Sequence, residues 1–234
     1  MGSDKSKDSL ADEDETWPFS ATGQGTVDLP AFYMGRYEVT EAQFKAFVDA
    51  DKDKVIDQAY QKGNPNRPVS DVSWRDALAY AQWLDTTLRE MGSIEIRKPL
   101  SAGWHVTLPS EAEWEKAARG TDGRIYPWGN KPDPSRANYN SGSTKPVGSY
   151  QCPECPYPLA DMSGNVYEWT RSLFEPYPYD ATDGREDLKA GTPRVVRGSS
   201  CCSAVRLVRA ASRRENSPVN RHYSIGFRVV VSRF

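Results

Sequence analysis

The stretch from Gly120 to Thr192 constrains the fold more than any other feature of this chain. It shows no helical periodicity, and Pro, Gly, Asn and Tyr dominate it. A segment of this length is too long for an ordinary loop, so aromatic contacts, short strands or a bound ion must organise it. With 17 Pro, 17 Gly, 7 Trp and 12 Tyr, the chain is typical of a loop-rich domain held together by large amphipathic rings.

Regular structure is predicted on both sides of this stretch. Helices are expected to begin at Thr40, Ser73 and Ser110, because apolar residues follow each at helical spacing. Gln43 and Glu113 stand three residues after two of these positions, which is the capping-box pattern. Short strands are expected at residues 104–108, 194–197 and 226–231. Helices first and a small sheet later, with a long irregular insertion, predict an α+β fold.

Composition argues against two classes of partner. The formal net charge is −2 over 234 residues, which gives no electrostatic case for binding nucleic acid. No apolar run approaches the length needed to cross a bilayer.

The four cysteines form two local pairs, Cys152 with Cys155 and Cys201 next to Cys202. Neither pair resembles a spread-out disulfide framework, so cysteine usage does not indicate a compartment. Cys152 and Cys155 are interpreted as a loop disulfide or as two free thiols. A zinc half-site is disfavoured, because no second pair of ligands is evident.

The first residues are interpreted separately from the domain. Met1 and Gly2 are typical of an expression vector, and no secretory signal peptide follows. Residues 3–15 are polar and charged, so residues 1–16 are expected to be a disordered tag or tether and residues 17–234 a single domain. The tail also resembles the tether of a bacterial lipoprotein. That interpretation predicts a cell-surface, outer-membrane lipoprotein, while a cytoplasmic location stays open.

Short motifs then occur in one order between Ala31 and Val231. They are MGRYEVT at 34–40, RPV at 67–69, LPSEAEWE at 108–115, YPWG at 126–129, LADMSGNVYEW at 159–169, RVVRG at 194–198 and IGFRV at 225–229. This order resembles the formylglycine-generating-enzyme, or sulfatase-modifying factor, family. The resemblance implies a C-type-lectin-like fold with small antiparallel sheets, a few helices and long irregular loops, here expected as a monomer.

The resemblance also implies a calcium site. In family enzymes the positions that match Asp161 and Glu168 look like ligands of calcium, a hard cation that takes several oxygen donors. A plain hydrogen-bonded loop is the alternative. A second family calcium site is in doubt, because the loop after Asn138 is short and lacks the matching Asp. No other cofactor is expected.

The family's catalytic residues are not matched. Its oxidases hold copper with two cysteines five residues apart, and those positions fall on Ser203 and Val208, which supply no thiolate. Cys201 and Cys202 are adjacent, and neighbours on an extended segment point to opposite faces. They are therefore interpreted as ordinary small residues.

A second enzymatic branch of the family holds iron with histidines. This chain has only His105, in an expected buried strand, and His222. No catalytic residue is therefore expected. The alternative kept open is a formylglycine-generating-type oxidase or a related sulfatase-modifying enzyme.

Residues 199–224 resemble the variable region of proteins that bacterial diversity-generating retroelements diversify. Errors at template adenines turn Asn codons into codons ending in a pyrimidine, which cannot encode Trp, Met, Lys, Gln or Glu. Within this segment only Glu215 breaks that restriction. The resemblance implies a fixed frame of the form R-x-A-x-R and P-x-x-R around replaceable positions. In this chain the frame consists of Arg209, Ala211, Arg213, Pro218 and Arg221.

The positions between the frame residues are predicted to be exposed on one face and to bind a ligand. They are Cys201, Cys202, Ser203, Val205, Arg206, Leu207, Arg214, Ser217, Val219, His222, Tyr223 and Ser224. Tyr, Arg, His and Ser on a rigid scaffold are useful binding chemistry. The sequence thus predicts a non-catalytic, receptor- or adhesin-like protein whose partner is a protein on another cell or molecule. An ordinary family member with drifted loop residues is the plain alternative.

Overall fold

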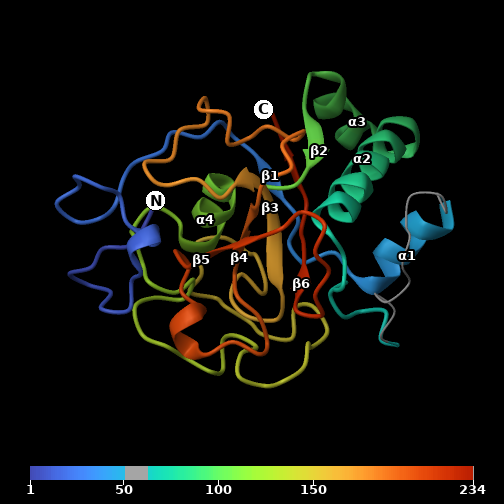
Figure 1. The fold of residues 1–234 in the computed structure, drawn as a ribbon. Helices are drawn as coiled ribbons and strands as arrows, with labels where there is room; N and C mark the ends of the chain where they lie inside the picture. The colour runs from blue at the N-terminus through green and yellow to red at the C-terminus, as the bar shows by residue number, and fades with distance from the viewer. Residues whose placement is uncertain (51–62, 234) are drawn as a thin grey trace.

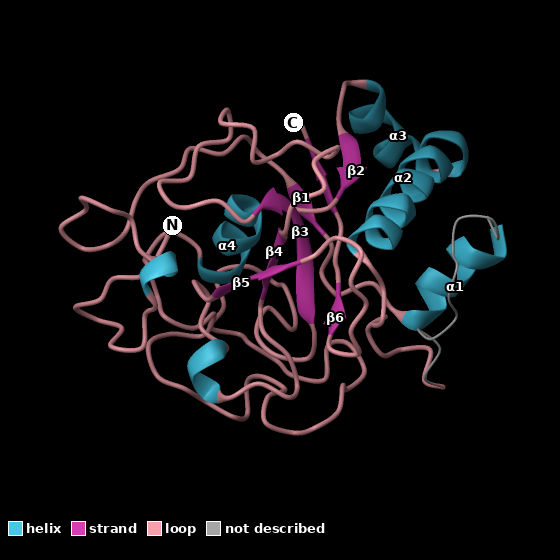
Figure 2. Cartoon of the chain, in the orientation of Figure 1, coloured by secondary structure: helices cyan, strands magenta, loops and turns pink. Residues whose placement is uncertain are grey.

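The computed structural model describes residues 1–50 and 63–233 of the chain. Two small sheets lie at the centre, helices α1 to α3 lie together at one end, and long loops wrap the opposite side (Figures 1 and 2). This arrangement is the α+β fold with long irregular loops that the sequence predicts. Loops make up most of the chain in Figure 2, and they are the part of the molecule that carries the candidate site.

The first sheet joins the two ends of the domain. Strand β7 (Val230–Ser232) lies between β1 (Tyr33–Met34) and β2 (His105–Thr107), antiparallel to both. Strand β2 confirms the strand predicted at residues 104–108. His105, however, is exposed rather than buried, so the expected buried histidine is wrong.

The second sheet has the order β5-β4-β3-β6 and supports the C-terminal segment. Its strands are β3 (Tyr167–Leu173), β4 (Arg194–Arg197), β5 (Arg213–Asn216) and β6 (Ile225–Gly226). Strand β6 runs parallel to β3, and the other pairs are antiparallel. All residues of β3 and β4 are buried, so this sheet is a rigid platform.

The single strand predicted at residues 226–231 is wrong in its extent. Residues 225–226 pair with β3 in one sheet, whereas residues 230–232 pair with β1 and β2 in the other. The chain changes sheets between them, so the side chains do not alternate between a core face and a solvent face. Phe227 and Arg228 are adjacent, and both are fully buried.

Three helices begin where the sequence predicts them. They are α1 (Glu41–Ala50), α2 (Trp74–Met91) and α4 (Glu111–Arg119). Thr40 and Gln43 exchange capping hydrogen bonds before α1. Ser110 and Glu113 do the same before α4, where Gly120 ends the helix. Among the described residues, three further helical pieces were not predicted: the 3-10 turn η1 (Glu13–Glu15), α3 (Ile94–Ser101) and the 3-10 turn η3 (Val205–Leu207).

The main core lies between α1, α2 and the last strands. Phe44, Phe47, Tyr80 and Phe227 pack ring against ring with centroid separations of 5.3–6.1 Å. Trp169, in the middle of β3, belongs to the same cluster and is fully buried. Contacts of this kind add to the area that the rings bury, so the core holds β3 firmly beneath the loops.

The disorder expected for residues 1–16 is wrong. The segment contains the short 3-10 turn η1 (Glu13–Glu15) and packs on the domain near α4. Its polar side chains find buried partners, because Asp8 and Glu15 both form ion pairs with Arg209. Composition predicts disorder only when a polar segment has nothing to bind. Here the buried Arg209 guanidinium supplies the missing partner.

Candidate ligand-binding surface

Buried arginines anchor residues 199–224 from below. Arg209 donates to Asp8 at 2.9 Å and to Glu15 at 2.8 Å. Arg213 donates two hydrogen bonds to the Glu111 carboxylate, at 2.7 and 2.8 Å. Both guanidinium groups are about 1% exposed. Burying a charge is costly unless it is paired in this way, so these two residues have little freedom to change.

A third arginine, on β4, holds the same segment by its backbone. The Arg197 guanidinium donates to the carbonyl oxygens of Ala210 and Ala211 and pairs with Glu115 at 2.6 Å. Nearby positive charge from Arg197 and Arg119 lowers the pKa of the buried Glu115 to about 2, against the opposing effect of desolvation. Glu115 therefore stays ionised, and Ala210 and Ala211 are held close against α4 and β4.

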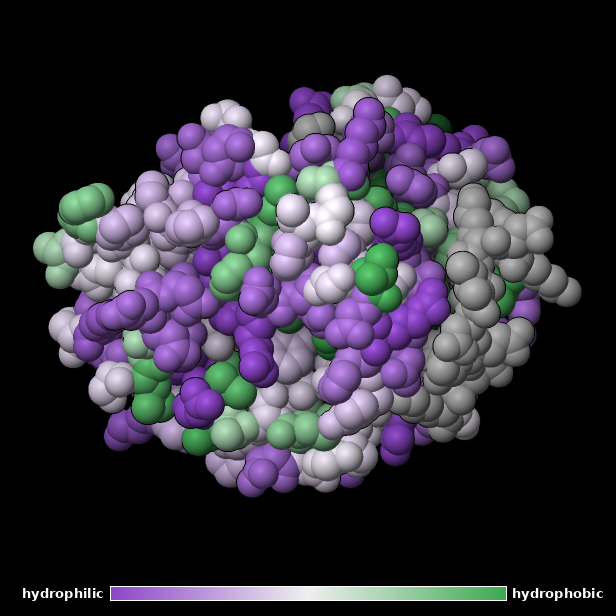
Figure 3. All heavy atoms as spheres, in the orientation of Figure 1, coloured by the Kyte–Doolittle hydropathy of each residue, from purple (hydrophilic) through white to green (hydrophobic). Residues whose placement is uncertain are grey.

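Most of the predicted binding positions lie at the surface. The exposed or half-buried ones form what we call the C-terminal surface: Cys202, Val205, Arg206, Leu207, Arg214, Ser217, Val219, His222 and Tyr223. In Figure 1 the orange turn η3 lies apart from strand β6, so the residues of this surface come from separate stretches of the backbone. On the face drawn in Figure 3, hydrophobic side chains lie scattered among hydrophilic ones.

Three of the twelve predicted positions are buried, so their expected exposure is wrong. They are Cys201, Ser203 and Ser224. Ser203 closes a tight turn by donating its backbone N–H to the Ser200 carbonyl at 3.1 Å. The Ser224 hydroxyl contacts His222 Nδ1 at 2.7 Å. Both turn inward because backbone and side-chain polar groups near them need partners.

Tyr167 is a residue of the surface that sequence reasoning missed. Its ring is nearly buried at the start of β3, and its hydroxyl lies 3.5 Å from Ser203 Oγ and 3.5 Å from Arg214 Nη1. It thus connects the turn at residues 200–203 with β5. The sequence did not single out Tyr167, because it does not show which side chains meet across a sheet.

Cys201 and Cys202 do not point to opposite faces. Their sulfur atoms lie 3.4 Å apart. They occupy the two central positions of the Ser200–Ser203 turn, and side chains alternate only on extended backbone. Burial raises the pKa of the Cys201 thiol to about 12, and the neighbouring Cys202 adds to the shift.

Comparison with known proteins places this geometry in a family. The family of sulfatase-modifying factor enzyme 1-like domains matches residues 1–233. The chain belongs to this family.

Individual relatives match most of the chain. This chain is 32% identical to the serine/threonine-protein kinase Pkn1 of Chlamydia trachomatis over 86% of this chain and 33% of that protein. It is 36% identical to the formylglycine-generating enzyme of Streptomyces coelicolor over 71% of this chain and 53% of that protein. The chain therefore spans only a third to about half of the length of these relatives.

Two solved structures share the fold. PvdO from Pseudomonas aeruginosa superimposes with a TM-score of 0.76 at 24% identity, covering 99% of this chain and 90% of that one. The Treponema denticola variable protein 1 gives a TM-score of 0.70 at 23% identity, covering 92% and 89%. The predicted fold of formylglycine-generating-enzyme type is thereby confirmed.

The residues implied as a calcium site in this family have protein partners here. Both carboxylate oxygens of Glu168 accept from Arg228, at 2.6 and 2.7 Å, and one also accepts from Trp114 Nε1 at 2.7 Å. Asp161 accepts from the Gly148 backbone at 2.6 Å, and burial raises its pKa. The Arg228 guanidinium already supplies a positive charge to Glu168, so the contacts of Glu168 favour the hydrogen-bonded alternative, and calcium at this position stays an untested prediction.

A second acidic group within the described residues lies at the N-terminal segment. Carboxylate oxygens of Asp12, Asp14 and Glu15 lie within 4.8 Å of one another. Glu15 already pairs with Arg209, and exposed acidic groups of this kind are common without an ion. Glu15 of this group is therefore part of the Arg209 anchor described above.

The positions that match the family's copper cysteines are not available for chemistry. Ser203 is buried in the turn, and Val208 is fully buried after η3. The two histidines have separate partners: His105 Nδ1 lies 3.2 Å from Arg89, whereas His222 contacts Ser224. Cys152 and Cys155 form a disulfide with a Cα–Cα distance of 5.4 Å, which decides between the two states left open by the sequence.

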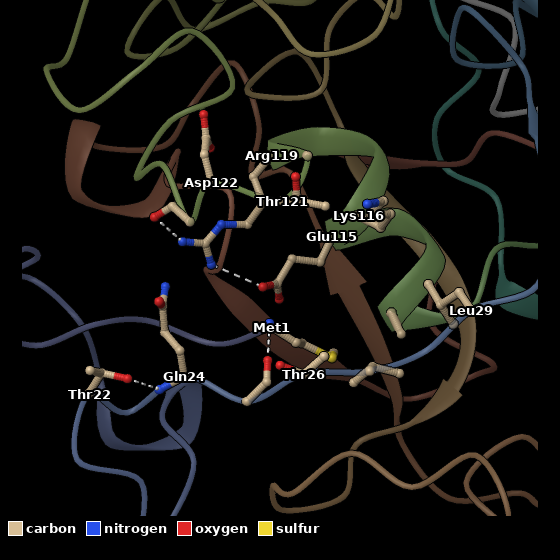
Figure 4. Close-up of a pocket in the computed structure, with 15 residues that line it drawn as sticks. Met1, Thr22, Gln24, Thr26, Leu29, Glu115, Lys116, Arg119, Thr121 and Asp122 are labelled. Atoms are coloured by element: carbon tan, nitrogen blue, oxygen red, sulfur yellow. Dashed lines mark hydrogen bonds and ion pairs between the residues drawn. The ribbon is translucent and has the colours of Figure 1, made fainter.

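A cavity of about 440 Å³ lies away from this surface, between the N-terminal segment and α4 (Figure 4). Arg119 and Glu115 point toward each other in it and pair at 3.0 Å. Its lining residues include no His, Cys or Ser. Every helix in residues 1–50 and 63–233 is too short or too polar to cross a membrane.

Proposed function

We propose that this chain is a non-catalytic binding domain that recognises a protein partner through its C-terminal surface. One observation carries the proposal: along residues 199–224, most frame residues are buried and most predicted binding positions are exposed. Arg209, Ala211, Arg213 and Pro218 of the predicted frame are buried, while most positions between them reach solvent. A segment built in this way can change its exposed chemistry without losing its backbone.

The energies of the two kinds of position differ widely. Removing one partner of a buried ion pair, such as Arg213 with Glu111, costs about 3–5 kcal/mol. Replacing an exposed residue such as Val219, which is 61% exposed, usually changes stability by less than about 0.5 kcal/mol. Replacement at the C-terminal surface is therefore nearly free of folding cost, which is what a diversified binding site needs.

The residue types support diversification of this surface. Val, Leu, Arg, Ser, His, Tyr and Cys fill the exposed positions, and each of these residue types can be encoded by a codon that ends in a pyrimidine. Glu215 is the exception within residues 199–224, and it is exposed on β5 beside Arg214.

The chemistry of the surface favours a protein as the partner. Tyr223 is 50% exposed, and the Arg206, Arg214 and His222 side chains reach solvent as well. Tyr and Arg on a broad surface are typical of protein recognition, whereas small ligands are held in concave pockets. The absence of thiolates at Ser203 and Val208 supports a role without oxidase chemistry.

A display library tests the proposal. Codons for Val205, Arg206, Arg214, Val219 and Tyr223 are randomised together, and the library is selected against several unrelated proteins. We expect specific binders whose melting temperatures stay within a few degrees of the parent protein. In a matched library, Arg209, Ala211 and Arg213 are randomised instead, and we expect most members to fail to fold. Equal loss of folding in both libraries would contradict the proposal.

A further inference from the structure

The turn at residues 200–203 brings two thiols together. Ser203 donates its backbone N–H to the Ser200 carbonyl, so Cys201 and Cys202 occupy the two central positions. Their Sγ atoms are 3.4 Å apart, close to van der Waals contact. Neither thiol is part of a disulfide. Two sulfurs at this separation need only a small movement to reach the bonding distance of about 2.05 Å.

The two thiols have different access to solvent. Cys202 is exposed, whereas Cys201 is 1% exposed. The backbone of Cys201 is also held in place, because its N–H donates to the Asn165 carbonyl at 2.9 Å and its carbonyl accepts from the Ser141 N–H at 2.8 Å. The Cys202 thiol can therefore react with a reagent from solution, while the Cys201 thiol lies buried next to it in a fixed position.

We propose that Cys201 and Cys202 form a vicinal dithiol site that undergoes reversible exchange with low-molecular-weight disulfides. This reaction is independent of the binding function proposed above. It requires only the two sulfurs and a disulfide of the glutathione class as oxidant. Within the described residues, the other cysteine pair, Cys152 with Cys155, is already joined and does not compete for the reagent.

The exchange proceeds in two balanced steps. The Cys202 thiolate attacks one sulfur of the small disulfide, the S–S bond of that molecule breaks, and one small thiol leaves with the proton from Cys202. The Cys201 sulfur then attacks Cys202 Sγ in the mixed disulfide, and the second small thiol leaves with the Cys201 proton. The protein loses two hydrogens and two electrons, and the small disulfide gains both.

The product is expected to be easy to reduce. Neighbouring Cα atoms are only about 3.8 Å apart across a trans peptide, whereas ordinary disulfides join Cα atoms about 4.4–6.8 Å apart. A bond between adjacent residues is therefore strained, and strained disulfides are the labile ones. The site is suited to a reversible change, while Cys152–Cys155, with its Cα atoms 5.4 Å apart, is in the ordinary range.

Mass spectrometry tests the proposal on the intact protein. The protein is incubated with oxidised glutathione, the remaining thiols are blocked, and the protein is cut with trypsin without reduction. Cleavage after Arg197 and Arg206 releases one peptide that contains both cysteines. We expect this peptide to lose the mass of two hydrogens and to regain it after mild treatment with reduced glutathione. Two unchanged thiols, or a stable glutathione adduct, would overturn the proposal.

Two variants separate the roles of the thiols. In Cys201→Ser, Cys202 has no resolving partner, so one glutathione should remain attached. In Cys202→Ser, the buried Cys201 should stay unmodified. If either variant does not fold, the mass of the wild-type peptide still decides the question. An adduct in wild type equal to that in Cys201→Ser would show that the second step does not occur.

Discussion

The Arg209 anchor provides the sharpest test of the division between frame and surface. Arg209→Met removes the guanidinium but keeps an apolar stem of similar length. It leaves Asp8 and Glu15, which are 7% and 1% exposed, without the charge that pairs them. Leaving a buried charge without its partner costs about 3–5 kcal/mol. For a domain of this size, that loss corresponds to a fall in melting temperature of about 6–20 °C.

Arg206→Met is the matched control. Arg206 lies three residues earlier, on η3, and its side chain is exposed. Its replacement should change the free energy of unfolding by less than about 0.5 kcal/mol. Urea unfolding followed by circular dichroism at pH 7 measures both variants. Equal effects of the two substitutions would refute the reasoning, because the frame would then be no more constrained than the surface.

The pH dependence gives a second readout of the same variant. Burial raises the pKa of Glu15 above its ordinary value, although Arg209 acts to lower it. A carboxyl whose pKa is higher in the folded protein than in the unfolded chain binds protons more readily when folded, so falling pH favours the native state at this group. Without Arg209 the pKa rises further. The loss of stability in Arg209→Met should therefore shrink between pH 7 and pH 5, and a loss that grows instead would show that Arg209 does not favour the ionised form of Glu15.

Three further outcomes are expected. The protein should produce no formylglycine from a cysteine-containing peptide, with or without copper, as measured by peptide mass; activity lost on mutating Cys201 or Cys202 would contradict the non-catalytic function. Excess chelator should leave the melting curve unchanged, since Arg228 neutralises Glu168; a rise in melting temperature on adding calcium would show that a site exists. The encoding DNA should carry a near-identical template repeat beside a reverse transcriptase gene. An upstream lipobox would support a surface location, and its absence would count against one.

Local features of the sequence predicted local structure well. The capping pairs Thr40 with Gln43 and Ser110 with Glu113 form as expected, because each involves residues only three positions apart. The strand at residues 194–197 is also present as predicted. The ordered series of motifs was enough to indicate the family and the fold. Helix α3 was not predicted, because its sequence contains Pro99, and proline inside a segment is typical of the end of a helix.

Errors arose wherever a residue's state depends on a partner far along the chain. Residues 1–16 looked disordered because their partner, Arg209, lies about 200 positions away. The sequence also does not show that Arg228 meets Glu168 across the core. In both cases a distant guanidinium neutralises the carboxylate, and only the folded chain brings the two together.

The sequence by itself determined the family and the capped helices. The tertiary structure decided which of the predicted binding positions in residues 199–224 reach solvent. It turned Ser203 and Ser224 inward, placed the Tyr167 hydroxyl between the turn and β5, and set the sulfurs of Cys201 and Cys202 3.4 Å apart. The physical reason is that local pattern specifies backbone preference, whereas burial and contact depend on which segments the buried ion pairs and the core hold together.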